Sequence, residues 1–382
     1  MSTSIWERSN VLGRRRCEVC VVGAGICGLS AAAALEARGV DCCIVERAHP
    51  GAGASGRNAG YLMRGFADNY RAACRELGDS RAQALWRATE RNRERLVADG
   101  IAALPSYAPR PSCLLALESD EERDLVEAAD RLAADGFAGV RLVRPGDLVD
   151  GAWATGHARL GLVNEHDAVV DPTQLVGLLA RRYQGPRLDG QPLLAVTEAG
   201  SRLALELAGG VLEADRVLVC TNAYASQVFP QLDGVVVPHR AQMLALDAPD
   251  LRLHCAYYAN RGGEYFREAG GGRVICGGCR KAHAADEETW ADHPTGAVQR
   301  AIEEFHFGLF GRRYPVVARW AGTMGFSPDG LPLVGPLADP RIWFVGAFTG
   351  HGMSLARVVA EEAVDAMLAG SEPPFSLARL AR

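Results

Sequence analysis

A strand, a glycine-rich turn and a helix near the start of the chain constrain its fold more than any other feature. An apolar run ends at Val22 and a second one ends at Glu46, with an alanine-rich helical stretch between them. The turn after the first run has the pattern G-x-G-x-x-G, made by Gly23, Ala24, Gly25, Ile26, Cys27 and Gly28. This order is typical of the β-α-β unit that opens a doubly wound parallel sheet.

Each part of this unit favours the binding of a dinucleotide. Gly23 permits a tight turn, Gly25 lets the backbone approach a pyrophosphate, and Gly28 lets the helix pack closely on the strand. The free amides at the helix N-terminus point at the phosphates. Glu46 lies at the spacing of the acid that binds a ribose hydroxyl, with Arg47 directly after it. The alternative interpretation is a glycine-rich turn without a ligand.

A second segment of small residues follows at once and favours a flavin over NAD. Residues 51–60 read G-A-G-A-S-G-R-N-A-G, which lets the backbone run beside a ligand while three polar side chains supply donors. The residues expected to contact the cofactor are Ala54, Ser55, Arg57, Asn58, Ala59 and Gly60. The alternative is a flexible linker.

Together these motifs resemble the D-amino-acid oxidase superfamily of FAD-dependent oxidoreductases, which includes glycine, sarcosine and γ-glutamylputrescine oxidases. Similar strings occur over residues 169–224, 235–280 and 320–356. The resemblance implies an α/β fold, with a Rossmann-like FAD-binding domain and an interleaved antiparallel-sheet substrate domain. The expected bounds are 15–85, 150–230 and 320–382 for the first domain, and 86–149 and 231–319 for the second.

The resemblance also implies cofactor contacts from later segments. The backbone of Leu194 or Val196 is expected against adenine, and Thr221 and Asn222 near the phosphates. A helix N-terminus is expected at the flavin pyrimidine, formed by Gly350, His351, Gly352 and Met353. His351 is also a candidate for proton transfer.

Substrate-pocket candidates come from the second domain and the returning segment. Tyr257, its neighbour Tyr258, and Tyr265 lie on expected strands over the flavin, although tyrosines on a sheet can equally be core or surface residues. Met324 stands where glycine-oxidase-type members carry a carboxylate-binding arginine. Ala59 and Ser354 stand where sarcosine-oxidase-type members carry an arginine and a lysine.

These uncharged positions disfavour a simple α-amino acid, because a desolvated carboxylate without a cationic partner costs several kcal/mol. Arg64, Arg240 or Arg280 could still supply such a partner. Gly322 stands about where sarcosine oxidases attach flavin through a cysteine, so we expect non-covalent FAD.

The sequence therefore predicts an FAD-dependent enzyme that oxidises the C–N bond of an amine. The hydride would pass to flavin N5, water would hydrolyse the imine, and dioxygen or another acceptor would take the electrons. The alternatives are a 2-hydroxy-acid dehydrogenase on the same fold and a flavin-binding subunit without catalysis of its own.

Whole-chain properties fit a small-molecule enzyme. A net charge of −5 and a pI near 6.0 leave no basic footprint for nucleic acid. No apolar stretch is long enough to span a membrane. The 11 cysteines are odd in number and many lie in expected strands or helices, which favours free thiols in a cytoplasmic protein. Cys276 and Cys279 are interpreted as flanking a turn, and no metal site is expected.

Overall fold

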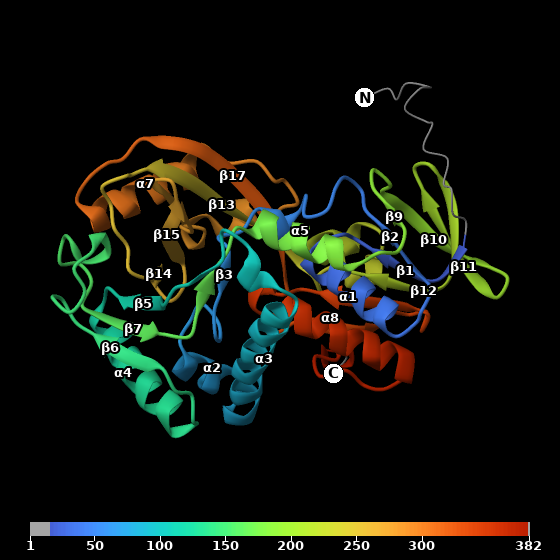
Figure 1. Cartoon of the computed structure of the whole chain (residues 1–382), viewed down its shortest axis with the longest axis horizontal. Helices are drawn as coiled ribbons and strands as arrows, with labels where there is room; N and C mark the ends of the chain where they lie inside the picture. The colour runs from blue at the N-terminus through green and yellow to red at the C-terminus, as the bar shows by residue number, and fades with distance from the viewer. Residues whose placement is uncertain (1–15, 381–382) are drawn as a thin grey trace. The chain divides into compact units, whose positions relative to one another are not determined.

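In the computed structural model, which describes residues 16–380, the chain forms two compact units built from separate stretches of sequence (Figure 1). The first unit comprises residues up to Gly56, Val176–His239 and residues from Met324 onward, and the second comprises Arg57–Leu175 and Arg240–Thr323. Residues 57–85 and 150–175, expected in the FAD-binding domain, thus belong to the second unit. The expected outer bounds at 15 and 382 lie outside the described residues.

The first unit is built on an eight-stranded sheet with a parallel centre. The parallel strands, in spatial order, are β9 (Arg187–Leu188), β2 (Cys42–Val45), β1 (Arg16–Val22), β12 (Gly210–Val219) and β19 (Ile342–Gly346). The antiparallel strands are β10 (Leu193–Ala199), β11 (Arg202–Leu207) and β18 (Leu333–Pro336). The strand interiors are apolar because both faces of a parallel sheet are covered.

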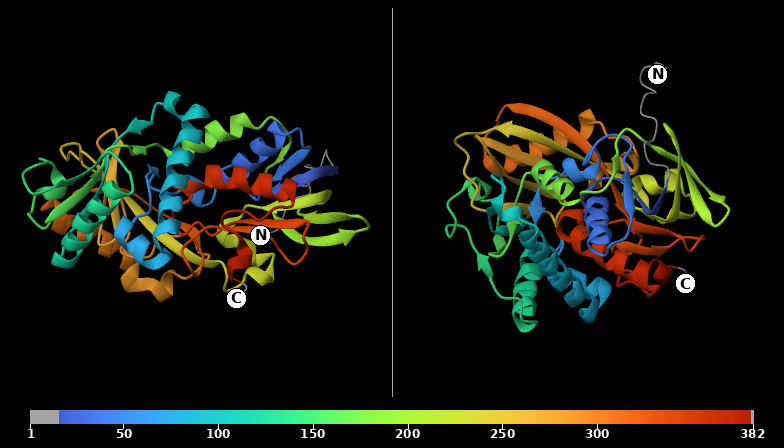
Figure 2. Two further views of the ribbon diagram at one scale, coloured as in Figure 1. Left: turned by 90° about the horizontal axis from the view of Figure 1, so that it is seen from below. Right: turned by 45° about the vertical axis from the view of Figure 1, so that its right-hand side comes forward.

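Two helices of the first unit, α1 (Ile26–Ala37) and α8 (Gly352–Ala369), pack side by side (Figures 1 and 2). Their buried positions are rich in alanine, which lets the helix axes approach closely. A third helix, α5 (Pro172–Arg182), begins in the second unit and continues into the first from Val176. It starts with proline at a position where no backbone donor is needed.

The hydrophobic core of the first unit is formed by residues of the parallel strands, of the adjoining β10–β12 meander and of the segment 225–236. Leu203, Leu205 and Leu207 of β11 are all buried, because alternate residues of a strand face the same side. They pack with β1 and β12 residues such as Val22 and Val219. This core supports the strands whose carboxyl ends carry the cofactor motifs.

The second unit is built on another eight-stranded sheet, which is mostly antiparallel, as the sequence predicts. Its strands in spatial order are β17 (Val316–Phe326), β13 (Val237–Asp247), β16 (Arg273–Gly277), β15 (Glu264–Gly270), β14 (Ala256–Ala259), β5 (Ser112–Ala116), β7 (Leu160–Asn164) and β6 (Val140–Val143). The pair β14–β5 is parallel. A small sheet joins β3 (Tyr61–Leu62), β8 (Ala168–Val169) and β4 (Ala108–Pro109).

Helices cover the large sheet of the second unit. One of them, α4 (Ser119–Ala134), packs on β5, β6 and β7, and α7 (Gly296–Phe310) packs against β16. The helices α2 (Tyr70–Leu77) and α3 (Asp79–Ala98) pack on each other, and α6 (Ala284–Glu287) is a single turn. None of the described helices is long and apolar enough to cross a membrane.

A buried carboxyl group, that of Asp167, holds the small sheet to the large one. It accepts hydrogen bonds from the Arg64 backbone N–H (2.8 Å), the Ser112 hydroxyl (2.5 Å) and the Asn164 amide (2.9 Å). Only 3% of Asp167 is exposed, and burial raises the pKa of its carboxyl to about 7. The folded protein therefore favours the protonated form of this group.

This raised pKa predicts that Asp167 makes the protein less stable as pH increases. The contribution of Asp167 to the free energy of unfolding is most favourable below the unfolded pKa of about 4. This contribution falls by up to about 4 kcal/mol as the pH rises to about 7. Asp167→Asn removes this titration and keeps the hydrogen-bond partners. The unfolding temperature of Asp167→Asn relative to that of the native protein should increase from about pH 5 to about pH 8.

The exposed Asp130 of α4 provides the control. Asp130→Asn makes the same chemical change at an exposed position of the same unit, so its pH series is the reference for that of Asp167→Asn. If Asp167→Asn behaves in the same way, the carboxyl group does not titrate as its burial implies.

Candidate functional site

The carboxyl ends of four parallel strands in the first unit carry predicted cofactor segments. The glycine turn follows β1, Glu46 follows β2, Thr221 and Asn222 follow β12, and residues 347–353 follow β19. Carboxyl ends of parallel strands lie at one edge of a sheet, which is where open α/β sheets bind their ligands. The structure thus brings together segments that are more than 300 residues apart in the sequence.

The glycine turn has no room for side chains at its critical positions. Gly23 adopts φ +102°, which favours glycine, and a Cβ at Gly28 would lie 1.9 Å from the Gly23 carbonyl oxygen. A Cβ at Gly25 would lie 2.8 Å from Oγ of Ser55. That Oγ accepts a hydrogen bond from the Ile26 N–H at 3.0 Å, which ties the Ala54–Gly56 turn to the start of α1.

The carboxylate of Glu46 is fixed beside this turn. Its Oε2 accepts from the Ala24 N–H at 2.8 Å and its Oε1 from the Ala48 N–H at 2.9 Å, and only 9% of the residue is exposed. Each carboxylate oxygen can accept more than one hydrogen bond, so this group keeps acceptor capacity for a further donor. Arg47, by contrast, stacks its guanidinium over the Tyr224 ring at 4.0 Å.

The segments after β12 and β19 interlock through unusual backbone conformations. Asn222, Ala347 and Thr349 have φ of 49°, 54° and 48°, a region that side chains disfavour. Oδ1 of Asn222 accepts from the Ala347 N–H at 2.8 Å, and the Thr349 N–H donates to the Gly325 carbonyl at 3.0 Å. Backbone strain of this kind is common at ligand sites. It could not be predicted from the residue types of Ala347 and Thr349.

Met324 and His351 lie close to the N-terminus of α8. A Cβ added at Gly350 would contact the Met324 sulfur at 3.5 Å. His351 is the N-cap residue and Gly352 begins the helix, followed by the buried Met353. Burial lowers the pKa of His351 to about 4, so its imidazole is neutral near pH 7. The positive end of the helix dipole, and not a charged His351, therefore contributes positive potential here.

The two adenine-contact candidates lie on β10 at the outside of the meander. Leu194 is 55% exposed and sits at a register shift between Leu193 and Ala195. Val196 is partly buried and packs against the leucine core. Their assignment to adenine stays a prediction.

The second half of the second motif, residues 57–60, belongs to the second unit and is held rigidly there. Arg57 donates to the Asp292 carboxylate at 2.9 Å and to the Ala321 carbonyl at 3.1 Å. Asn58 Oδ1 accepts from the Gly60 N–H at 2.7 Å. Gly60 has φ +72°, and a Cβ there would lie 1.9 Å from the Val170 carbonyl oxygen. The segment is a fixed loop and not a flexible linker.

Three tyrosines of the second unit contact one another and are here named the tyrosine face: Tyr258 and Tyr265 on one face of the large sheet, and Tyr61 on β3 of the small sheet. Ring centroids lie 5.0 Å apart for Tyr61 and Tyr258, and 5.7 Å apart for Tyr258 and Tyr265. The Tyr265 ring covers Gly277, where a Cβ would come within 2.4 Å of it. Burial raises the pKa of Tyr265 to about 12 and that of Tyr258 still further, so both phenols are neutral.

Tyr257 points to the opposite face, since successive residues of a strand alternate. It is fully buried, stacks on Phe266 at 5.1 Å between ring centroids, and donates its hydroxyl to Asp150 at 2.5 Å. We therefore leave Tyr257 out of the proposed pocket. The sequence alone does not distinguish Tyr257 from Tyr258, because a β-strand buried on both faces shows no alternation of polar and apolar residues.

Two of the three arginines considered as carboxylate partners are already engaged. Arg240 forms a bidentate ion pair with Glu287 at 2.7 and 3.0 Å, and both side chains are at most 5% exposed. Arg64 uses its Nη1 to donate to the Ala138 carbonyl at 2.8 Å and to Glu90 at 3.3 Å, while its buried Nη2 has no hydrogen-bond partner among residues 16–380. Arg280 is half-buried, and it interacts electrostatically with Tyr265.

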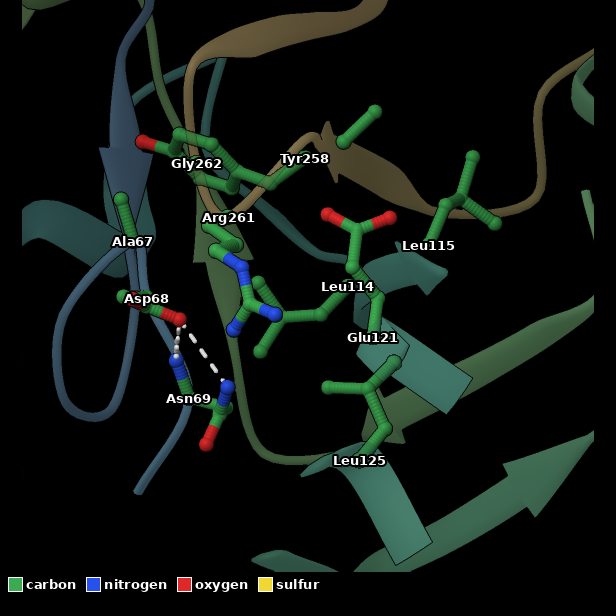
Figure 3. A pocket seen from close by; sticks show the side chains of 11 residues that line it. Ala67, Asp68, Asn69, Leu114, Leu115, Glu121, Leu125, Tyr258, Arg261 and Gly262 are labelled. Carbon is green, nitrogen blue, oxygen red and sulfur yellow. Dashed lines mark hydrogen bonds between the residues drawn. The ribbon is translucent and has the colours of Figure 1, made fainter. Parts of the chain in front are cut away.

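A pocket beside Tyr258 is lined by groups that stabilise local structure (Figure 3). Glu121 accepts from the Leu117 and Glu118 amides at the start of α4, and Asn69 caps α2. Arg261 pairs with two carboxylates of α4, one of them at 2.8 Å. These polar groups are already used within the protein.

Comparison with known proteins decides the family. The model of the DAO family, described as FAD dependent oxidoreductase, matches residues 18–366. The chain belongs to this family. It is therefore an oxidoreductase with FAD as cofactor, which confirms the resemblance, the fold class and the cofactor expected from the motifs.

Curated relatives and solved structures agree with this assignment. The probable oxidoreductase OrdL of Rhizobium meliloti is 27% identical over 364 residues, covering 90% of this chain and 81% of the relative. The γ-glutamylputrescine oxidoreductase of Escherichia coli is 25% identical over 381 residues, covering 90% and 83%. Glycine oxidase from Geobacillus kaustophilus has the same fold, with a TM-score of 0.76, 20% identity and coverage of 96% and 98%.

The first unit's residues fit FAD. The turn excludes side chains at Gly28 and presents backbone amides at the start of α1, as a pyrophosphate requires. The Glu46 carboxylate is fixed beside this turn and can accept a further hydrogen bond. We propose these residues as the adenosine and pyrophosphate site of the cofactor.

This assignment predicts that Glu46→Gln weakens FAD binding. Loss of one charge-assisted hydrogen bond to the ribose costs about 1.5–3 kcal/mol, or about 10-fold to about 150-fold in Kd. Titration of the apoprotein with FAD, followed by flavin fluorescence, measures it. Glu36→Gln is the matched control, because Glu36 also accepts from a backbone amide, that of Gln184, but lies outside the cofactor motifs. Equal Kd values for the two variants would contradict the ribose role.

Proposed function

We propose that this enzyme oxidises the C–N bond of an amine that presents alkyl or aromatic surface, rather than a carboxylate, beside its reacting carbon. The observation that carries the proposal is the chemistry of the tyrosine face. Tyr258 and Tyr265 offer neutral aromatic rings there, while Arg64 and Arg240 are engaged elsewhere. Bound FAD supplies the hydride acceptor, and the imine product is then hydrolysed.

The protein's own part in this reaction is to bind and orient a neutral amine. Oxidation at the C–N bond needs the amine lone pair, so the site must not hold the amine as an ammonium ion. The neutral phenols of Tyr258 and Tyr265 add no charge that would do so. Positioning of this kind can account for much of a rate enhancement without a strong base.

The names of the relatives support an amine over a hydroxy acid. The Escherichia coli relative is named for γ-glutamylputrescine, and another relative, from Pseudomonas putida, is a glycine oxidase. We further propose that FAD is held non-covalently, since Gly322 stands where a cysteine would attach it. Dioxygen or another acceptor would reoxidise it, and the free cysteines support a cytoplasmic setting.

Matched substrate pairs test this proposal. Each pair consists of an amine and the same amine with an α-carboxylate, and steady-state kcat/KM is measured for both. The amine should be favoured at least about tenfold, because an unpaired desolvated carboxylate costs more than about 1.4 kcal/mol. Met324→Arg should narrow the ratio, and Met324→Leu, which adds no charge, should not.

The opposite ranking would contradict the proposal. If the carboxylated member has the higher kcat/KM in every pair, the site binds amino acids. Arg280 would then be the residue to replace, since it is the arginine that interacts with Tyr265.

A further inference from the structure

Arg267 is a buried cation that links two segments of the second unit. It lies on β15, on the same side as Tyr265, and is 5% exposed. Its Nε donates to the Ala59 carbonyl at 2.5 Å, its Nη2 to the Val170 carbonyl at 3.1 Å and its Nη1 to the Glu268 carbonyl at 2.8 Å. One guanidinium thus satisfies three backbone acceptors.

The first of these acceptors belongs to the loop proposed to contact FAD. Within that loop the Gly60 N–H is bound to Asn58, and the Gly60 carbonyl accepts from the Val170 N–H at 2.9 Å. Arg267 adds the bond to Ala59 and a second bond to Val170. The Ala59–Gly60 peptide is therefore fixed from both sides, and its orientation depends on the arginine.

Arg267 carries its charge without an ion pair among residues 16–380: each of its three hydrogen bonds ends on a carbonyl oxygen. Burial lowers its pKa and the carboxylate of Asp171 opposes this shift, but an arginine remains protonated in proteins. Burying an arginine in place of an apolar residue is unfavourable unless the guanidinium makes well-directed hydrogen bonds. The geometry used here is the fork that reaches Ala59 and Val170 together.

We propose that Arg267 is a positioning residue for the cofactor, which holds the Arg57–Gly60 loop in the conformation that binds FAD. This inference rests on the proposed assignment of that loop to FAD and does not depend on the substrate. It goes beyond the sequence motifs, because Arg267 lies about 200 residues after the loop on a different strand.

Two substitutions separate the fork from the charge. Arg267→Lys keeps the charge but can reach fewer carbonyls, and Arg267→Met loses both. FAD titration of the folded apoprotein should show at least about a tenfold increase in Kd for both variants, because the Ala59 and Val170 carbonyls are no longer both held and the loop loses its fixed conformation. The visible circular dichroism of the bound flavin should also change, because its surroundings are repositioned.

Arg110→Met is the matched control. Arg110 also donates to a backbone carbonyl, that of Leu253 at 2.8 Å, and pairs with Glu268 at 3.1 Å, but neither partner belongs to the loop. It should lower the unfolding temperature of the apoprotein without changing the FAD Kd or the flavin spectrum. If Arg267→Met does not fold, Arg267→Lys carries the comparison.

The inference is overturned if the Arg267 variants bind FAD with the native Kd and spectrum. It is equally overturned if their Kd changes no more than that of Arg110→Met, which would leave Arg267 a purely structural role. If the Arg267 variants bind FAD more weakly but the native enzyme oxidises no amine, this inference is supported and the proposed substrate class is wrong.

Discussion

The close contact between Gly28 and the Gly23 carbonyl is the constraint on which the first unit depends. A single methyl group at Gly28 would lie 1.9 Å from that oxygen, so α1 can begin where it does only with glycine there. This contact sets the start of α1 against the end of β1, and the alanine-rich face of the helix then packs on α8. The result is a set of backbone amides facing the edge where Glu46 and Asn222 also lie, which is the geometry a dinucleotide needs.

In the second unit, two buried arginines bind groups of the protein itself, whereas the rings of Tyr258 and Tyr265 are proposed to contact the substrate. Arg240 is held by Glu287, and Arg267 by three carbonyls. Each group is satisfied internally, as a buried polar group must be. The rings of Tyr258 and Tyr265 are half-buried and their phenols are neutral, and this supports an amine with apolar surface as the proposed substrate.

Local patterns in the sequence predict the β-α-β unit, the FAD cofactor and the antiparallel sheet, because each depends on neighbouring residues. Three features could not be predicted in this way. The direction in which Tyr257 and Tyr258 point depends on strand register, and the positive φ of Ala347 depends on the Asn222 side chain. The bond from Arg267 to Ala59 joins a strand to a loop about 200 residues earlier in the sequence. The boundary between the units within the second motif is likewise a property of packing.

The most direct test of the account is anaerobic reduction of the bound flavin by a panel of amines and 2-hydroxy acids, followed by the visible absorption of oxidised FAD. The account predicts rapid bleaching with amines that carry alkyl or aromatic groups, and none with hydroxy acids. Bleaching by hydroxy acids alone would identify a hydroxy-acid dehydrogenase. A flavin that no compound bleaches would indicate a binding subunit, and either result would contradict amine oxidation as the function of this fold.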